Sequence, residues 1–255
     1  MYDDLARPPL RPASLNRALA SDGWRVEVLP ETESTNAVVA GRARAGEPAG
    51  LVVVAEQQTA GRGRLGRSWV SPPRAGLTFS VLLRPTLPLA HWGWVPLLSG
   101  LAVARALRGQ TGLDALLKWP NDVLVSGRKV CGVLAEVAAP GAAVVGIGLN
   151  VTTRREELPH DGASSLQLEG SGTTDRDTIL RAVLRELSAV TADDAAARAD
   201  YRRLCATLGA PVRVELPAGP PVIGTADGVD DDGRLIVDGT PYGAGDVVHL
   251  RPATP

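Results

Sequence analysis

Lysine is almost missing from this chain of 255 residues. Only Lys118 and Lys129 are lysines, and the other 25 of the 27 basic residues are arginines. Genome composition is the simplest explanation of this bias. A lysine that is retained against such a bias is nevertheless a candidate for a chemical role, because a compact ammonium and a planar guanidinium hold anions differently.

The chain also contains few cysteines and few histidines, and its net charge is small. The two cysteines, Cys131 and Cys205, exclude a disulfide scaffold and a zinc site made of cysteines. The three histidines lie far apart in the sequence and form no metal-binding motif. The net charge of −1 argues against a general nucleic-acid or membrane-surface binder.

Long hydrophobic runs are missing as well. Residues 1–12 lack the apolar segment of a signal peptide. The apolar stretch 77–107 is interrupted by arginines, prolines and a histidine, so it cannot span a bilayer. We therefore expect a cytoplasmic protein with no membrane partner and no nucleic-acid partner.

What remains is an ordinary globular composition, with 44% hydrophobic and 22% charged residues. Short strands joined by tight turns between residues 115 and 151 indicate an antiparallel meander rather than βαβ units. Ser34 or Thr35 is the expected N-cap of the second helix. Helices are predicted over 10–20, 36–45, 92–108, 177–190 and 193–204, and strands over 24–29, 51–55, 77–83, 115–118, 123–125, 129–137 and 143–151.

The character of the sequence changes after Leu208-Gly209. Short strands over 212–215, 222–226, 235–237 and 247–250 are separated by glycine, proline and aspartate turns. The sequence therefore predicts a large domain over residues 1–207 and a small all-β domain over residues 208–255.

An arginine-glycine loop, Gly61-Arg-Gly-Arg-Leu-Gly-Arg67, follows a buried strand. Its glycines match the dinucleotide spacing G-x-G-x-x-G, but the helix and the acidic residue that this fold needs do not follow. Arg62, Arg64 and Arg67 instead offer charge-assisted hydrogen bonds to an anion beside exposed backbone amides. A solvated flexible loop and an RNA-binding segment are the alternatives.

The segment Lys118-Trp-Pro-Asn-Asp122 places three polar groups at a turn. They suit contact with a nucleotide phosphate or a metal-bound phosphate, and an ordinary turn with a core tryptophan is the alternative. Lys129 begins a strand in which we expect Cys131 to share its face and Gly132 to point the other way. Gly132, Gly146 and Gly148 interrupt apolar strands, which indicates either a pocket floor or tight packing.

Together these motifs resemble the biotin–protein ligase family, over about residues 34–150. The motifs, in order, are Ser34-Thr35-Asn36, Gln58, the arginine-glycine loop with Trp69, Lys118 to Asp122, Lys129-x-x-Gly132 and Gly146-x-Gly148-x-Asn150. The resemblance implies an α+β fold, with a largely antiparallel or mixed sheet and flanking helices, like the catalytic domain of class II aminoacyl-tRNA synthetases. It also implies a small C-terminal SH3-like β-barrel.

The resemblance implies an activity too. The family uses ATP and Mg²⁺ to make biotinoyl-5′-adenylate with release of pyrophosphate, then passes the biotinoyl group to a lysine of a biotin carboxyl carrier domain of a carboxylase. Only 33 residues precede Ser34, so we expect no DNA-binding domain and no repressor role. The protein is expected to be a monomer or a homodimer. A lipoate or octanoate ligase of the same fold and a non-catalytic binding module are the alternatives.

The resemblance also assigns the site residues. The catalytic candidates are Lys129, which meets the biotin carboxylate, Arg64, and Asp122, a candidate for Mg²⁺ or the phosphate network; no cluster of protein ligands for a metal is expected. The implied biotin residues are Ser34, Thr35, Asn36, Gln58, Gly61, Arg62, Gly63, Arg64, Lys129, Gly132, Gly146 and Gly148. The implied ATP residues are Arg64, Arg67, Trp69, Lys118, Asn121 and Asn150, with Trp69 against the adenine.

Overall fold

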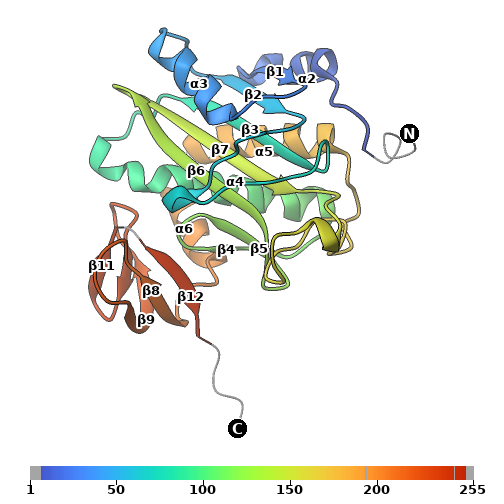
Figure 1. The fold of residues 1–255 in the computed structure, drawn as a ribbon. Coiled ribbons are helices and arrows are strands. Elements are labelled where there is room, and N and C mark those ends of the chain that lie inside the picture. The colour runs from blue at the N-terminus through green and yellow to red at the C-terminus, as the bar shows by residue number, and fades with distance from the viewer. Residues whose placement is uncertain (1–6, 193, 244, 251–255) are drawn as a thin grey trace.

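The computed structural model describes residues 7–192, 194–243 and 245–250, which form two β-sheets with helices around the larger one (Figure 1). The larger sheet has seven strands in the order β1-β2-β3-β7-β6-β5-β4. Their bounds are β1 Arg25–Leu29, β2 Leu51–Ala55, β3 Gly76–Leu83, β4 Ala115–Lys118, β5 Asp122–Val125, β6 Arg128–Ala139 and β7 Ala142–Asn150.

The larger sheet is mixed, as predicted. Strands β1 and β2 are parallel and are connected through α3 (Thr35–Arg44), whereas every other neighbouring pair in this sheet is antiparallel. The meander predicted between residues 115 and 151 is confirmed as β4 to β7. Ser34 is the N-cap residue of α3, although its side chain makes no capping hydrogen bond.

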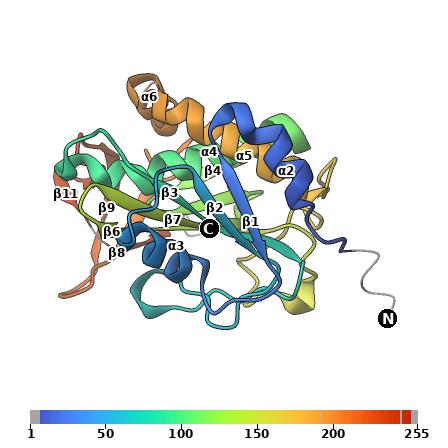
Figure 2. The ribbon, with the colours of Figure 1, turned by 90° about the horizontal axis from the view of Figure 1, so that it is seen from above.

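Helices cover both faces of this sheet, and Figure 2 shows α2, α4, α5 and α6 on one side and α3 on the other. Their bounds are α2 Pro12–Leu19, α4 Trp94–Thr111, α5 Arg176–Ala192 and α6 Asp194–Leu204. Strand β2 is buried along its whole length because it has helices on both faces, which explains its continuous apolar sequence. Pro96 lies in the first turn of α4, where its missing N–H costs no helical hydrogen bond. Asp193, the predicted start of the last helix, lies outside the described residues.

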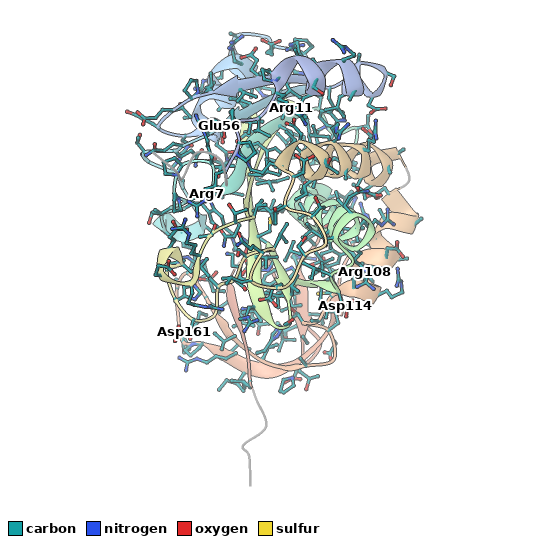
Figure 3. The ribbon with its side chains drawn as sticks, turned by 90° about the vertical axis from the view of Figure 1, so that its right-hand side faces the viewer. Arg7, Arg11, Glu56, Arg108, Asp114 and Asp161 are labelled. Carbon is teal, nitrogen blue, oxygen red and sulfur yellow. The ribbon has the colours of Figure 1, made fainter. Side chains whose placement is uncertain are left out.

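Ion pairs fix the N-terminal segment to the segment after β7 and to α5. Arg7 pairs with Glu157 and Arg11 with Asp177, each at 2.6 Å. Arg176 and Glu56 form a buried pair, also at 2.6 Å. Figure 3 shows Arg11 and Glu56 in the part of the molecule away from the C-terminal sheet, with Arg7 nearer the middle.

The C-terminal sheet has the order β11-β10-β9-β8-β12. Its strands are β8 Pro211–Glu215, β9 Val222–Val229, β10 Leu235–Val237, β11 Thr240–Tyr242 and β12 Asp246–His249. The predicted strands are all present; β11, which contains Pro241, was not predicted. Two buried indoles, Trp94 at the start of α4 and Trp119 after β4, hold this sheet in place, because Trp119 Nε1 donates to Gly233 O at 3.1 Å and Trp94 Nε1 donates to Asp230 O at 3.1 Å.

Within the described part of the chain, none of the helices combines the length and the apolar character needed to cross a membrane.

Candidate active site

A pocket of about 740 Å³ opens on the α3 face of the large sheet. Its walls come from the start of α3, strands β3, β6 and β7, the loop 58–70 and the segment 157–163. The sequence-predicted residues that line it are Ser34, Thr35, Asn36, Gln58, Arg62, Gly63, Arg64, Arg67, Trp69, Asn121, Lys129, Gly132, Gly146, Gly148 and Asn150. Gly61, Lys118 and Asp122 do not line the pocket, but each contacts or electrostatically influences residues that do, as described below.

The parallel pairing of β1 and β2 continues past the strand ends and brings Gln58 beside α3. Thr32 N donates to Gln57 O at 3.1 Å, and Thr59 N donates to Thr32 O at 3.0 Å. Gln58 Oε1 then accepts the backbone N–H of Thr35 at 2.7 Å. The first turn of α3 and the loop after β2 are thereby held together at one end of the pocket.

Behind Thr35 lies a chain of polar side chains. Ser80 Oγ is 2.7 Å from Thr35 Oγ1 and 2.5 Å from Asn36 Oδ1. Asn36 Nδ2 donates to Glu136 Oε2 at 2.6 Å. Ser80 and Asn36 are buried, so this polar group satisfies its own hydrogen bonds inside the protein.

Three glycines form the pocket floor. Gly132 and Gly148 lie opposite each other on β6 and β7, and Gly146 lies further along β7. A Cβ at Gly148 would lie 2.3 Å from Cε2 of Trp69, and a Cβ at Gly146 would lie 2.3 Å from Asn36 Oδ1. The glycines therefore allow the Trp69 indole and the Asn36 amide to approach the sheet directly.

Trp69 is held by the arginine-glycine loop itself. Its backbone N–H donates to Gly61 O at 2.9 Å, and a Cβ at Gly61 would lie 2.3 Å from Trp69 O. The indole Nε1 is buried and has no hydrogen-bond partner among the described residues. An unpaired buried donor at the pocket wall is available to a ligand.

The predicted face of Lys129 is wrong. A β-bulge shifts the register of β5 and β6 so that Lys129 pairs with Leu124 while Cys131 pairs with Val123. The extra residue reverses the alternation of side chains. Lys129 therefore extends over Gly132, with Nζ 3.1 Å from the position that a Gly132 Cβ would take, while Cys131 is buried in the core, where burial raises the pKa of its thiol.

Lys129 is fixed at both ends. Its backbone N–H donates to Gly162 O and its carbonyl accepts from Ser164 N, each at 2.8 Å. Its Nζ lies 2.6 Å from Asp122 Oδ1 and 5.9 Å from the centre of the Trp69 ring. The buried Asn150 holds the same segment, since its Nδ2 donates to Ser164 O at 2.9 Å.

The arginines of the loop contact two other parts of the chain. Arg64 Nη1 donates to Asn121 Oδ1 at 3.2 Å and its Nη2 donates to Gly245 O at 3.3 Å. Arg67 forms an ion pair with Asp246 at 2.8 Å. Burial lowers the pKa of the Arg64 guanidinium, against the opposing charge of Asp246. The start of β12 in the C-terminal sheet is thus in direct contact with the loop.

Lys118 lies beside the pocket rather than in its lining. It is opposite Asp122 in the pairing of β4 and β5. Burial lowers the pKa of its ammonium group, the charge of Asp122 acts in the opposite direction, and the charge of Lys129 adds to the lowering. Both lysines of the chain therefore flank one carboxylate.

Sequence reasoning missed three contributors to this site. Ser80 and Glu136 connect to Asn36, and Asp246 pairs with Arg67. A serine and a glutamate inside otherwise apolar strands were available signals for the first two. Within the described residues there is no cluster of three or more histidine, cysteine, aspartate or glutamate side chains that could hold a metal ion.

Sequence comparison matches both parts of this architecture. The profile of the Biotin/lipoate A/B protein ligase family matches residues 28–152, and that of the Biotin protein ligase C terminal domain matches residues 207–250. The chain is 45% identical to the biotin–[acetyl-CoA-carboxylase] ligase of Mycobacterium tuberculosis, over 97% of this chain and 98% of that protein. This chain belongs to the biotin protein ligase family. The resemblance found in the motifs is thereby confirmed.

Other biotin ligases agree in sequence and in fold. The bifunctional ligase/repressor of Escherichia coli strain K12 is 33% identical over 85% of this chain and 70% of that protein. The structure of a mutant biotin protein ligase from Aquifex aeolicus in complex with biotin superposes with a TM-score of 0.73 at 30% identity, and it covers 89% of this ligase and 100% of that chain. The same enzyme in complex with biotin and ATP gives a TM-score of 0.70 at 28% identity, over 89% of this chain and 99% of that chain. The predicted fold, a mixed sheet with flanking helices and a small C-terminal sheet, is confirmed.

Proposed function

We propose that this protein is a biotin–[acetyl-CoA-carboxylase] ligase. It activates biotin as biotinoyl-5′-adenylate with ATP, releases pyrophosphate, and transfers the biotinoyl group to a lysine of a biotin carboxyl carrier domain. The observation that carries this proposal is a single pocket in which a glycine floor and hydrogen-bonding side chains meet Lys129, Arg64 and Arg67. The relatives named for the same activity support it.

The two sheets correspond to two proposed domains. Residues 1–207 are the catalytic domain and residues 208–255 the small C-terminal domain. Contacts from Gly245 and Asp246 to Arg64 and Arg67 support a role for the small domain in holding the loop next to the pocket.

The end of the pocket near Thr35 is the proposed site for the ureido group of biotin. Thr35, Asn36 and Gln58 lie there at the end of the glycine floor, and Arg62 and Gly63 close over it. The valeryl chain then extends along the Trp69 indole, which itself lies against Gly148 and Gly132. This direction places the biotin carboxylate next to Lys129.

Attack of that carboxylate on the α-phosphate of ATP brings two anions together. Cations that already lie at the point of attack lower the barrier, because they need no reorganisation as charge develops on phosphorus. Lys129 is held by its backbone and by Asp122, and its compact ammonium fits between a carboxylate and a phosphate. Arg64, Arg67 and Lys118 supply further positive charge on the proposed ATP side.

The nucleotide side of the site uses groups already oriented by the protein. Arg64 and Asn121 bond each other, and Asn150 is fixed by Ser164. The unpaired Trp69 Nε1 offers a donor at the boundary between the two substrates. The arginine-glycine loop then covers the mixed anhydride and keeps water away from it.

Magnesium fits this site as a companion of the nucleotide. Asp122 is a carboxylate beside both Lys118 and Lys129, and it could supply a single protein contact to the ion. The phosphates of ATP would supply most of the remaining ligands. Mg²⁺ would neutralise phosphate charge during adenylation.

The test is pyrophosphate release from ATP with no acid, with biotin, with lipoate and with octanoate. We expect release that depends on biotin, followed by transfer to an added carrier domain. Release with lipoate or octanoate alone would reassign the protein to a different acyl ligase, and no release with any of the acids would contradict an adenylating activity.

A further inference from the structure

We infer that Glu136 and Ser80 are positioning residues that make the Thr35 hydroxyl a hydrogen-bond acceptor toward the ligand. Neither residue is placed against the substrate; Glu136 acts through Asn36, and Ser80 acts through its direct contact with Thr35. The inference rests on the proposed function, because it concerns the end of the pocket proposed for the ureido group of biotin. It states which hydrogen-bonding groups the protein presents there.

Glu136 determines the orientation of the Asn36 amide. A carboxylate oxygen only accepts hydrogen bonds. Because Glu136 Oε2 lies 2.6 Å from one end of the Asn36 amide, that end must be the NH₂ group. The backbone carbonyl of Leu134, also an acceptor, lies 3.4 Å from the same nitrogen. The amide oxygen of Asn36 therefore faces Ser80.

The orientation of the Asn36 amide in turn determines the orientation of the Ser80 hydroxyl. Its side chain is completely buried, and its hydroxyl has one hydrogen to donate. Asn36 Oδ1 lies 2.5 Å away and only accepts, so the Ser80 hydrogen points to Asn36. Ser80 consequently meets Thr35 Oγ1, at 2.7 Å, with its lone pairs rather than with its hydrogen.

These hydrogen bonds determine where the hydroxyl hydrogen of Thr35 points. Its own hydroxyl hydrogen has two neighbouring acceptors, Ser80 Oγ at 2.7 Å and Gln58 Oε1 at 3.0 Å. Ser80 Oγ is the nearer acceptor and faces Thr35 with its lone pairs, whereas Gln58 Oε1 already accepts the Thr35 backbone N–H at 2.7 Å, so the hydroxyl hydrogen points to Ser80. Thr35 lines the pocket, so its oxygen presents acceptor lone pairs to a ligand there.

This polarity selects a ligand with an N–H group at that position. The cyclic urea of biotin carries two N–H donors, whereas the dithiolane of lipoate and the alkyl chain of octanoate carry none. A site built to hydrogen-bond one substrate discriminates strongly against an analogue that lacks the group, because its buried polar atoms are then left unpaired. Arg62 Nη2 lies 3.7 Å from Glu136 Oε2, so the loop that closes the pocket contacts the carboxylate that sets the polarity.

The test uses Ser80→Ala and Glu136→Ala in the full-length enzyme, because a glutamine at position 136 would keep an oxygen that accepts from Asn36. Ser99→Ala is the matched control for the first, since Ser99 is buried and its hydroxyl bonds Val95 O within α4 at 2.7 Å. Glu27→Ala is the control for the second, since Glu27 is half-exposed and pairs with Arg42 as Glu136 pairs with Arg62. Each variant is assayed for pyrophosphate release with biotin and with an analogue in which CH₂ replaces one urea N–H.

We expect both variants to raise the KM for biotin about tenfold with kcat nearly unchanged, while both controls behave as the wild type. The preference of the wild type for biotin over the CH₂ analogue should shrink in the variants, because they no longer hold the acceptor that the N–H group meets. A merely structural defect would lower activity with both ligands equally and keep that preference.

A KM for biotin unchanged in Glu136→Ala, or an undiminished preference in both variants, would overturn the inference. If Ser80→Ala fails to fold, the surface-accessible Glu136→Ala variant decides the question alone. Failure of the proposed function would show in the wild type, as pyrophosphate release without dependence on biotin. Failure of the positioning role would show only in the variants.

Discussion

Lys129 Nζ lies 2.6 Å from Asp122 Oδ1, and Lys118 lies opposite Asp122 on the neighbouring strand. The two lysines of a chain that otherwise uses arginine thus share one carboxylate at the edge of the pocket. A lysine at position 129 has a compact charge that enters the space above Gly132, where its Nζ comes within 3.1 Å of the position of a Cβ. A guanidinium is wider and flat, and it would contact Trp69 in the same space.

We predict that Lys129→Arg preserves the fold and slows adenylation. The expected loss is about 2–4 kcal/mol of transition-state stabilisation, as for the removal of a well-placed oxyanion donor. Single-turnover pyrophosphate release measures it, with the thermal unfolding midpoint as the control for folding. A release rate equal to that of the wild type would exclude Lys129 from the adenylation step.

Arg64→Ala should weaken retention of the adenylate. Arg64 bonds both Asn121 and the backbone of Gly245, so its loss removes two of the contacts that hold the loop. We expect free activated biotin to leave the enzyme and to react with added hydroxylamine faster than in the wild type. Arg25→Ala, which removes an ion pair to Glu47 outside the pocket, is the control. Equal retention in Arg64→Ala and wild type would show that the loop does not shield the intermediate.

Alanine substitutions at two glycines of the pocket floor should lower activity to different extents. At Gly148 a Cβ would lie 2.3 Å from the Trp69 ring, whereas at Gly132 its nearest contact is the flexible end of Lys129 at 3.1 Å. Gly148→Ala should therefore displace the indole and lower kcat/KM by at least tenfold more than Gly132→Ala does. Tryptophan fluorescence of the free enzyme should change in the first variant only. Equal effects of the two substitutions would mean that Trp69 is not seated on the floor.

His249 predicts a pH-dependent stability. Its Nε2 lies 3.0 Å from Thr207 Oγ1, and Thr207 also accepts the backbone N–H of Trp119. Burial lowers the pKa of the imidazole, and the positive charge of Lys118 adds to this effect. The unfolded chain, with an ordinary histidine pKa of about 6.5, therefore binds the proton more readily.

It follows that the His249 contribution to stability is complete above about pH 6.5 and is lost as the pH falls from there through the folded-state pKa. Unfolding midpoints between pH 5 and pH 7.5, compared for wild type and His249→Gln, measure it. The acid-side loss of stability should be smaller in the variant, with exposed His160→Gln as the control. Parallel profiles for His249→Gln and wild type would assign that loss to other groups.

Local patterns in the sequence identified most strands and helices, because burial and turn chemistry are encoded by neighbouring residues. They misplaced Lys129, because the β-bulge at Val130 depends on the partner strand β5 and leaves no mark in the alternation of β6 itself. They also missed β11, in which Pro241 argues against a strand unless that strand lies at the edge of its sheet, as β11 does.

The candidate site likewise contains residues that the sequence predicted and residues that it did not. The motif residues Thr35, Gln58 and Lys129 were predicted from the resemblance and do line one pocket. Ser80 and Glu136 were not predicted, because their importance comes from contacts with Asn36 across 44 and 100 residues of sequence. Only the folded sheet brings these side chains together.

The most direct test of the whole account is the intact mass of a biotin carboxyl carrier domain after incubation with this enzyme, ATP, Mg²⁺ and biotin. The account predicts that each carrier gains one biotinoyl group, that the gain requires both ATP and biotin, and that it disappears when the acceptor lysine of the carrier is replaced by arginine. A carrier that stays unmodified while the enzyme releases pyrophosphate, or one that gains mass only with a different acid, would contradict it.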